Sequence, residues 1–158
     1  MISPCPAAEA PRICQVINDA AQAYRGVIPH EHWHEPYMPM EELEAEMKAG
    51  VRFWAHGEYD GVMGLQEVKD AALIRHAYTR TREQGKGIGS ALLEHLKRHT
   101  DRPLLVGTWK AATWAVRFYE SRGFRLVDEA EKARLLKKYW ERVSEEQARA
   151  SVVLVLGQ

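Results

Sequence analysis

The chain has 158 residues, of which 46% are hydrophobic, and its 22 basic and 22 acidic side chains give no net charge. This balance argues against a basic surface for nucleic acid or anionic membranes, and the length suits one domain with its own core. Two cysteines make no disulfide framework, and no apolar run approaches the ~20 residues of a membrane span. We therefore expect a soluble cytoplasmic protein, without a signal peptide and with no nucleic-acid or membrane partner.

The N-terminal part predicts a short edge strand and one amphipathic helix. Met1 to Cys5 has the character of an edge strand, because prolines flank its end. A helix is expected from about Pro11 to Gly26, since apolar residues recur at helical spacing. These residues are Ile13, Val16, Ile17, Ala20 and Tyr24.

The segment Arg25–Met40 is polar and aromatic, and its three prolines argue against a regular helix. His30, His32 and His34 alternate, so an extended chain would place them on one side. We predict no metal here, because no cysteine or clear fourth ligand accompanies the imidazoles. A loop that lines a substrate pocket, with Trp33 and Tyr37 as walls, is favoured over metal binding. A packed connection is the remaining alternative.

Antiparallel strands are expected next. A helix from about Met40 to Lys48, acidic in its first turn, precedes strands at Val51–His56 and Val62–Val68. A turn at Lys69–Asp70 leads into a third strand, which ends at Tyr78–Thr79.

A glycine-rich stretch, Gln84-Gly85-Lys86-Gly87-Ile88-Gly89-Ser90, follows that strand and opens a helix. Ile88, Leu92 and Leu96 give this helix one apolar side. Alternate glycines let the backbone approach a ligand, and the free amides of a helix N-terminus attract phosphate. The spacing fits neither the dinucleotide fingerprint nor the nucleoside-triphosphate loop. A glycine-rich turn with no ligand is the plain alternative.

The C-terminal part predicts two strands and two helices before a final strand. The expected elements are a strand at Leu104–Gly107, a helix at Trp114–Arg122, a strand at Phe124–Val127, a helix at Glu129–Arg142 and a strand at Ser151–Leu156.

Two motifs resemble those of the GNAT superfamily of N-acetyltransferases. Gln84, Gly87 and Gly89 match the Gln/Arg-x-x-Gly-x-Gly/Ala loop for the pyrophosphate of acetyl-CoA, and Ala115–Phe124 matches A-x-x-F-Y-x-x-x-G-F. The resemblance covers roughly residues 73–127. It implies an α/β fold whose mixed, mostly antiparallel central sheet is splayed in the middle and flanked by helices, as a single domain over residues 1–158.

The resemblance also implies site residues. The backbone of Ala77, Tyr78 and Thr79 should line the pantetheine arm, and the amides from Gln84 to Ser90 should hold the pyrophosphate. Tyr119 should lie near the thioester sulfur as proton donor. The chain departs from the family at Ala112, where many members carry an asparagine that helps hold the cofactor; Lys110 and Thr113 are the candidates to replace that contact.

The general base is open at this stage. Family members often place a carboxylate or histidine where this chain has Arg75 and Leu73. His76 lies on the same strand, but alternation turns it to the opposite face unless a bulge redirects it. A histidine buried against the helices is an equal alternative. Glu67, His32 and an ordered water are rival bases, and Arg75 is expected to bind an anionic group of the acceptor.

These residues predict transfer of an acetyl group from acetyl-CoA to a primary amine of a small, amino-acid-like molecule. A catalytically silent acyl-CoA-binding regulator and a peptide or protein N-acetyltransferase are the alternatives. The helix at Glu129–Arg142 is expected to cover the substrate side or to mediate homodimer contacts.

Overall fold

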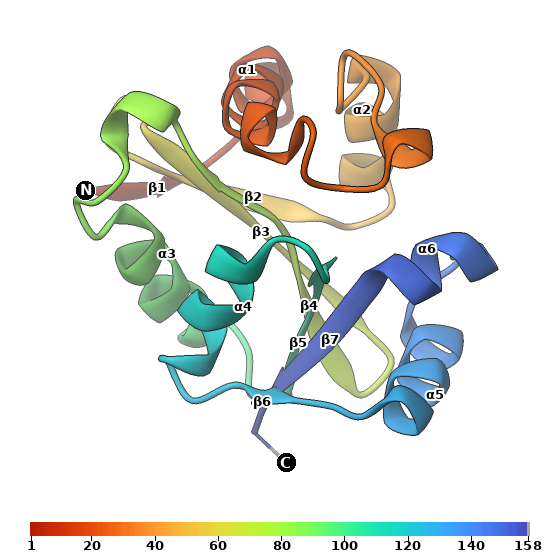
Figure 1. Cartoon of the computed structure of the whole chain (residues 1–158). Helices are drawn as coiled ribbons and strands as arrows, with labels where there is room; N and C mark the ends of the chain where they lie inside the picture. Colours follow the sequence, from red (N-terminus) through yellow and green to blue (C-terminus); the bar gives the residue numbers. More distant parts are fainter. Residues whose placement is uncertain (158) are drawn as a thin grey trace. The chain divides into compact units, whose positions relative to one another are not determined.

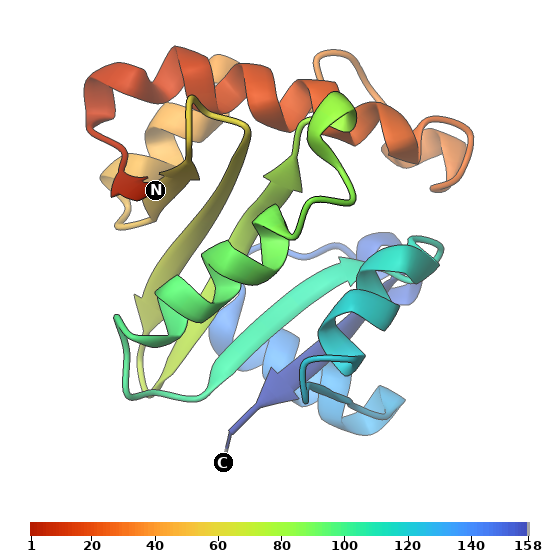
Figure 2. The ribbon, with the colours of Figure 1, turned by 90° about the vertical axis from the view of Figure 1, so that its left-hand side faces the viewer.

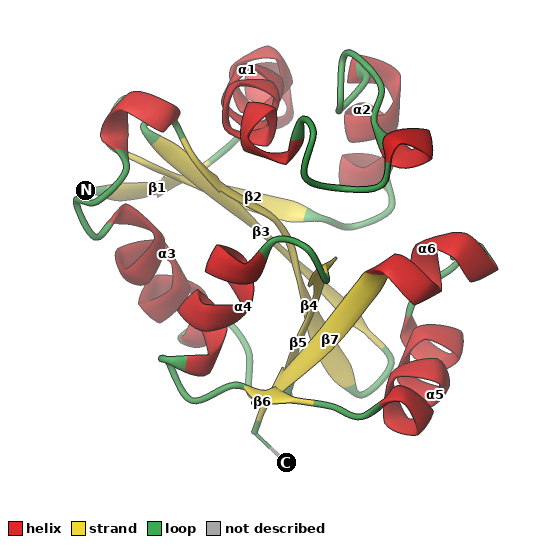
Figure 3. Cartoon of the chain, in the orientation of Figure 1, coloured by secondary structure: helices red, strands yellow, loops and turns green. Residues whose placement is uncertain are grey.

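The computed structural model describes residues 1–157, which fold into the helices and strands shown in Figures 1 and 3. The strands form one seven-stranded, mostly antiparallel sheet in the order β1-β2-β3-β4-β5-β7-β6. The strands are β1 (Ile2–Pro4), β2 (Arg52–His56), β3 (Gly61–Val68), β4 (Ala71–Thr79), β5 (Leu104–Trp109), β6 (Arg125–Leu126) and β7 (Ser151–Leu156). The helices are α1 (Ala10–Ala20), α2 (Met40–Lys48), α3 (Ile88–Lys97), α4 (Thr113–Glu120), α5 (Glu129–Tyr139) and α6 (Glu145–Ala150).

The residues group into two compact units. The first contains Met1–Ala23, His34–Glu67 and Ile74–Asp101; the second contains Tyr24–Trp33, Val68–Leu73 and the chain from Arg102 onward. Strand β4 contributes residues to each unit. The expectation of a single domain over 1–158 stays a prediction.

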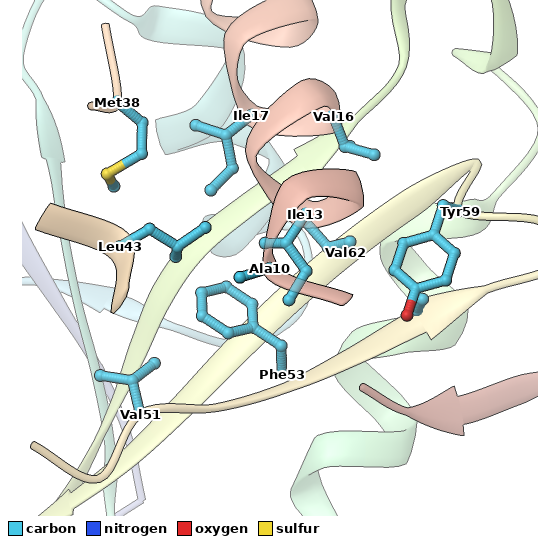
Figure 4. Close-up of a cluster of buried hydrophobic side chains, with 11 residues drawn as sticks. Ala10, Ile13, Val16, Ile17, Met38, Leu43, Val51, Phe53, Tyr59 and Val62 are labelled. Atoms are coloured by element: carbon cyan, nitrogen blue, oxygen red, sulfur yellow. The ribbon is translucent and has the colours of Figure 1, made fainter. Parts of the chain in front are cut away.

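One face of the first unit is closed by α1 and α2. Phe53 of β2 is buried among residues of these two helices, together with Val51 and Ala55, which lie two residues away on the same face of the strand. Figure 4 shows Ile13 of α1 close to the Phe53 ring, with Leu43 of α2 beside them. This apolar contact is what the helical spacing in α1 predicted.

Helix α3 covers the other face of the same strands (Figure 2, green helix). Trp54 follows Phe53 and therefore points the opposite way. The centroid of its ring lies 6.2 Å from the ring centroid of His95 on α3 and 4.6 Å from that of His99, which follows α3. The sheet of the first unit thus has helices on each side.

The second unit has its own core, built on β5 and β7. Leu105 and Val155 lie opposite each other in this antiparallel pair, and Leu135 and Leu136 of α5 pack against them. The Lys132 ammonium on α5 donates to the carbonyls of Ala148 at 2.7 Å and Ser151 at 3.0 Å. Helix α5 is therefore a packed part of this core.

Several element boundaries differ from the expectations: β5 runs on to Trp109, α4 covers Thr113–Glu120, and β6 is limited to Arg125–Leu126. Helix α1 ends at Ala20, and a 3-10 helix over Ala21–Tyr24 continues the turn that was expected as α-helix. Helix α5 ends at Tyr139 because Trp140 takes an extended conformation. Helix α6 was not predicted, although Ser144 and Gln147 form a capping box at its start.

No helix among residues 1–157 combines the length and the apolar character that a membrane crossing requires.

Strand β4 contains a backbone irregularity that matters for the site. His76 has a φ of +53°, in the left-handed region that costs free energy for a residue with a Cβ. Beside it, Gly64 of β3 leaves room for the chain, since a Cβ there would meet the Arg75 carbonyl oxygen at 2.9 Å and the Phe53 ring at 3.0 Å. Gly64 is thus required by close approach and not by its own dihedral angle.

We predict that Gly64→Ala lowers the free energy of unfolding by about 1–3 kcal/mol, because the added methyl group overpacks a rigid backbone contact. Gly107→Ala on β5 is the matched control, since its Cβ would meet Trp140 at an ordinary 3.4 Å. Urea denaturation measures both variants. Equal stability of the two would contradict this account of Gly64.

Candidate active site

The glycine-rich loop opens α3 with its backbone amides exposed to a ligand. Gly87 is the N-cap of α3 with φ +78° and ψ +14°, and its carbonyl accepts the first helical bond from Ala91 N–H at 3.0 Å. The helix geometry leaves the preceding amides without helical partners. A Cβ built on Gly85 or Gly87 meets nothing within 4 Å, so the space over the loop is open. These features fit a pyrophosphate.

Hydrogen bonds from neighbouring elements anchor this loop. Thr81 N–H donates to the Asp19 carboxylate of α1 at 2.8 Å. Arg80 donates from Nε to the Tyr59 carbonyl and from its backbone N–H to the Asp60 carbonyl, each at 2.8 Å. The Lys86 ammonium pairs with Glu83 at 2.9 Å. The segment that leads into the loop, at Arg80 and Thr81, is therefore tied to α1 and to the turn between β2 and β3.

The end of β4 leads directly into this loop. Ala77, Tyr78 and Thr79 are half-buried there. Gly61 of β3 lies close to them, since a Cβ on it would meet Ile88 at 2.7 Å and the Tyr78 carbonyl oxygen at 3.2 Å. Gly61 therefore leaves the room that the Ile88 side chain of α3 and the Tyr78 carbonyl of β4 occupy.

Arg75 and His76 converge on one carboxylate, that of Glu46 on α2. His76 Nε2 lies 2.5 Å from Glu46 Oε1, and Arg75 Nη2 lies 3.3 Å from the same atom. Neighbours on a regular strand point to opposite faces, so the left-handed conformation at His76 accounts for this convergence. Arg75 Nη1 also donates to Gln66 Oε1 at 2.8 Å.

This cluster is largely shielded from water. The side chains of Arg75, Glu46 and His76 are 23%, 19% and 16% exposed. The Phe53 ring stacks on His76 with 6.1 Å between ring centroids. His76 thus contacts Glu46 of α2 and the Phe53 ring from a strand position with a left-handed backbone, and its catalytic role stays a prediction.

Glu46 is ionised at neutral pH. Burial acts to raise the pKa of its carboxyl, but the hydrogen bond from His76 and the charges of His76 and Arg75 outweigh burial, so the pKa lies below its usual value. No sequence signal identified Glu46, which is one of several acidic residues on α2. What distinguishes Glu46 from the other acidic residues of α2 is its contact with His76, thirty residues further along the chain.

Tyr119 lies on α4 in the second unit and is buried. Its ring makes edge contacts with Phe118 and Phe124, at 5.1 and 5.2 Å between centroids. Burial raises the pKa of its phenol far above the usual value, with a smaller contribution from Tyr24. The hydroxyl is protonated at neutral pH, as a phenol of ordinary pKa also is.

Position 112 shows what replaces the family's asparagine. Ala112 is fully buried at the N-cap of α4, and its N–H donates to the Trp109 carbonyl at 3.0 Å. Thr113, named by the sequence as a substitute, accepts from Arg117 at 3.2 Å. Its part in holding a cofactor stays a prediction.

The structure places the loop aromatics and histidines in separate surroundings. His30–His32 form a 3-10 helix after Pro29, so the extended conformation that would place the three histidines on one side does not occur there. His32 stacks on Trp109 in the second unit, whereas His34 stacks on Tyr37 in the first. Trp33 caps the 3-10 helix, and Tyr37 packs against the core of the first unit. Their roles as pocket walls stay predictions.

Two other candidate bases have structural partners. Glu67 accepts a hydrogen bond from the Thr100 hydroxyl at 3.0 Å, and His32 takes part in the Trp109 stack. Within residues 1–157, no group of three or more histidine, cysteine, aspartate or glutamate side chains is arranged to hold a metal ion.

Comparison with known proteins supports this geometry. The family model of the acetyltransferase (GNAT) domain matches residues 15–152. A search of curated protein sequences gives no match.

Solved structures share the fold at low sequence identity. A GNAT-family acetyltransferase from Staphylococcus aureus Mu50 has a TM-score of 0.71 and 14% identity, with 98% of this chain and 96% of the other covered. The PaiA N-acetyltransferase from Thermoplasma acidophilum, in complex with coenzyme A, has a TM-score of 0.69 and 16% identity, covering 98% and 96%. The ribosomal-protein-S18-alanine N-acetyltransferase from Escherichia coli has 0.67 and 15%, covering 99% and 92%.

The strand-loop-helix site and the matched family define the class of this protein, which is an acyltransferase. The chain belongs to the GNAT family of acetyl-CoA-dependent N-acetyltransferases.

Proposed function

We propose that this enzyme moves an acetyl group from acetyl-CoA to the primary amine of a small, amino-acid-like molecule. The loop from Gln84 to Ser90 carries the proposal, because Gly87 opens α3 in the left-handed conformation under open space. Coenzyme A bound to the similarly folded PaiA protein supports it. The half-buried free thiols of Cys5 and Cys14 suit a reducing cytoplasm.

In this proposal the chain's residues divide the work of binding. The amides of Gln84 to Ser90 hold the pyrophosphate, and the backbone of Ala77–Thr79 lines the pantetheine arm. Bound acetyl-CoA supplies an activated acetyl thioester. The residues here fit that group through their glycines, their open space and their anchored backbone.

Two side chains handle protons. His76 takes a proton from the ammonium of the acceptor, so that a neutral amine is available to attack. Tyr119, a phenol that is protonated at neutral pH, donates its proton to the departing sulfur and regains the second proton that the amine nitrogen loses as the amide forms. Each role is a proposal for these residues, supported by the contacts of His76 and by the buried position of Tyr119.

Arg75 is proposed to hold an anionic group of the acceptor. Its bonds to Gln66 and Glu46 occupy two of the five N–H donors of a guanidinium and fix its orientation. Donors that remain can reach a carboxylate or phosphate. An acceptor with an amine and an anion is amino-acid-like.

A protein substrate is the second candidate, supported by the likeness to an N-acetyltransferase of a ribosomal protein. A catalytically silent acyl-CoA-binding regulator is the third, supported by Ala112 in place of asparagine. The oligomeric state stays a prediction.

Release of free thiol from acetyl-CoA in the presence of an amine panel tests the function. We expect thiol release with small amines that carry an anionic group. Acetylation of peptides alone would favour the second candidate, and tight acetyl-CoA binding without turnover would favour the third.

Gly87→Val should abolish acetyl-CoA binding measured by calorimetry, because its side chain would cover the amides. Gly26→Val is the matched control for backbone strain, since Gly26 has φ +76° and equally open space.

We expect Arg75→Gln to raise the KM for the acceptor about tenfold or more, because a hydrogen bond to a charged group contributes ~1.5–3 kcal/mol. The KM for acetyl-CoA should change far less. Gln66→Met is the control, because it removes one hydrogen-bond partner of Arg75 but keeps the positive charge of Arg75 itself. An equal rise in the two KM values would contradict this role.

Tyr119→Phe should lower kcat about 100-fold, the low end of general acid catalysis, because a thiolate is already a good leaving group. The variant keeps the ring contacts with Phe118 and Phe124, so stability and acetyl-CoA affinity should barely move. The measurement requires chemistry to be rate-limiting. A kcat close to wild type would show that Tyr119 serves packing alone.

A further inference from the structure

The Glu46 carboxylate contacts two neighbouring residues of β4 and is more buried than a surface ion pair. Its Oε1 atom receives Arg75 Nη2 and His76 Nε2, and the three side chains are each less than a quarter exposed. Glu46 lies in the last turn of α2, next to Met47, which packs on the core of the first unit. The carboxylate is therefore carried by an element whose position the core determines.

The bond to Glu46 selects the tautomer of His76. An ionised carboxylate only accepts hydrogen bonds, so the proton of the neutral ring must lie on Nε2. The lone pair is then on Nδ1, which is the atom able to accept a proton. Stacking by Phe53 restricts the plane of the same ring.

Arg75 and His76 would lose different hydrogen bonds if the Glu46 carboxylate were removed. Arg75 would keep its bond to Gln66 at 2.8 Å. His76 has Glu46 as its hydrogen-bond partner within the described chain, and it sits in a strained left-handed conformation. Strain of this kind persists where surrounding contacts impose it, and it is typical of functional sites. The contacts around His76 thus point to orientation of its ring.

We propose that Glu46 is a positioning residue for deprotonation of the acceptor: it holds His76 with the lone pair on Nδ1 and stabilises the imidazolium that forms. This rests on the proposed function. The N–H bond of the acceptor ammonium breaks, its electron pair stays on nitrogen, and the proton moves to Nδ1. The ring then carries one positive charge beside the Glu46 carboxylate, and it returns the proton to solvent after product leaves.

Glu46→Gln tests the charge separately from the hydrogen bond, because the amide oxygen can still accept from Nε2–H. We expect kcat to fall about 10- to 100-fold, part of the ~10²–10⁴ that general base catalysis contributes. The KM for acetyl-CoA should stay within about twofold. Glu44→Gln is the matched control, an exposed position on the same helix that should leave kcat unchanged.

A double-mutant cycle decides through which partner Glu46 acts. His76→Asn is chosen because asparagine tolerates a positive φ. If Glu46 acts through His76, Glu46→Gln adds no further loss of kcat in the His76→Asn background. If Glu46→Gln lowers kcat further in the His76→Asn background, the proposal is overturned. It is also overturned if the effect of Glu46→Gln on kcat persists in the His76→Asn background and vanishes in the Arg75→Gln background, because Glu46 would then act through Arg75.

Nitrogen NMR of the His76 ring gives a readout that needs no substrate. We expect the Nε2–H tautomer in wild type, and its loss in Glu46→Ala. An Nδ1–H tautomer in wild type, or a ring insensitive to Glu46→Ala, would overturn the proposal even if amines are acetylated. If no amine is acetylated although the tautomer depends on Glu46, the proposed function itself has failed and the catalytic role of Glu46 falls with it.

Discussion

The left-handed backbone at His76 is the constraint on which the arrangement of the first unit's site depends. It interrupts the alternation of β4, so that Arg75 and His76 reach the same carboxylate on α2. The glycine at position 64 gives the bulge its space, and Phe53 packs against the ring that the bulge redirects. The packing of Phe53, the backbone conformation of β4 and the contacts of Glu46 therefore all involve His76. A substitution that alters one of them is expected to alter the others.

The glycine-rich loop depends on its surroundings in the same way. Left-handed angles at Gly85 and Gly87 turn the chain into α3, but hydrogen bonds to Asp19, Tyr59 and Asp60 determine where the loop lies. An anchored loop loses little conformational entropy when a ligand binds, because its backbone is already ordered. This preorganisation is consistent with a cofactor site.

Family membership and substrate choice rest on different parts of the molecule. The family match spans residues 15–152 as a whole, whereas the charges that could meet an acceptor are those of Arg75, His76 and Glu46, which contact one another. A shared fold supports many chemistries through local changes of this kind. The acceptor is therefore to be sought from the charges of this cluster and not from the fold.

The sequence alone determined the features that depend on neighbours in the chain. Helical spacing identified the core face of α1, the glycine spacing identified the turn that opens α3, and the Ser151–Leu156 strand was predicted with its observed bounds. Tertiary structure decided the rest. The left-handed backbone at His76 and the choice of Glu46 among several glutamates depend on contacts that no local pattern encodes. A carboxylate thirty residues away becomes a partner only when packing brings α2 against β4.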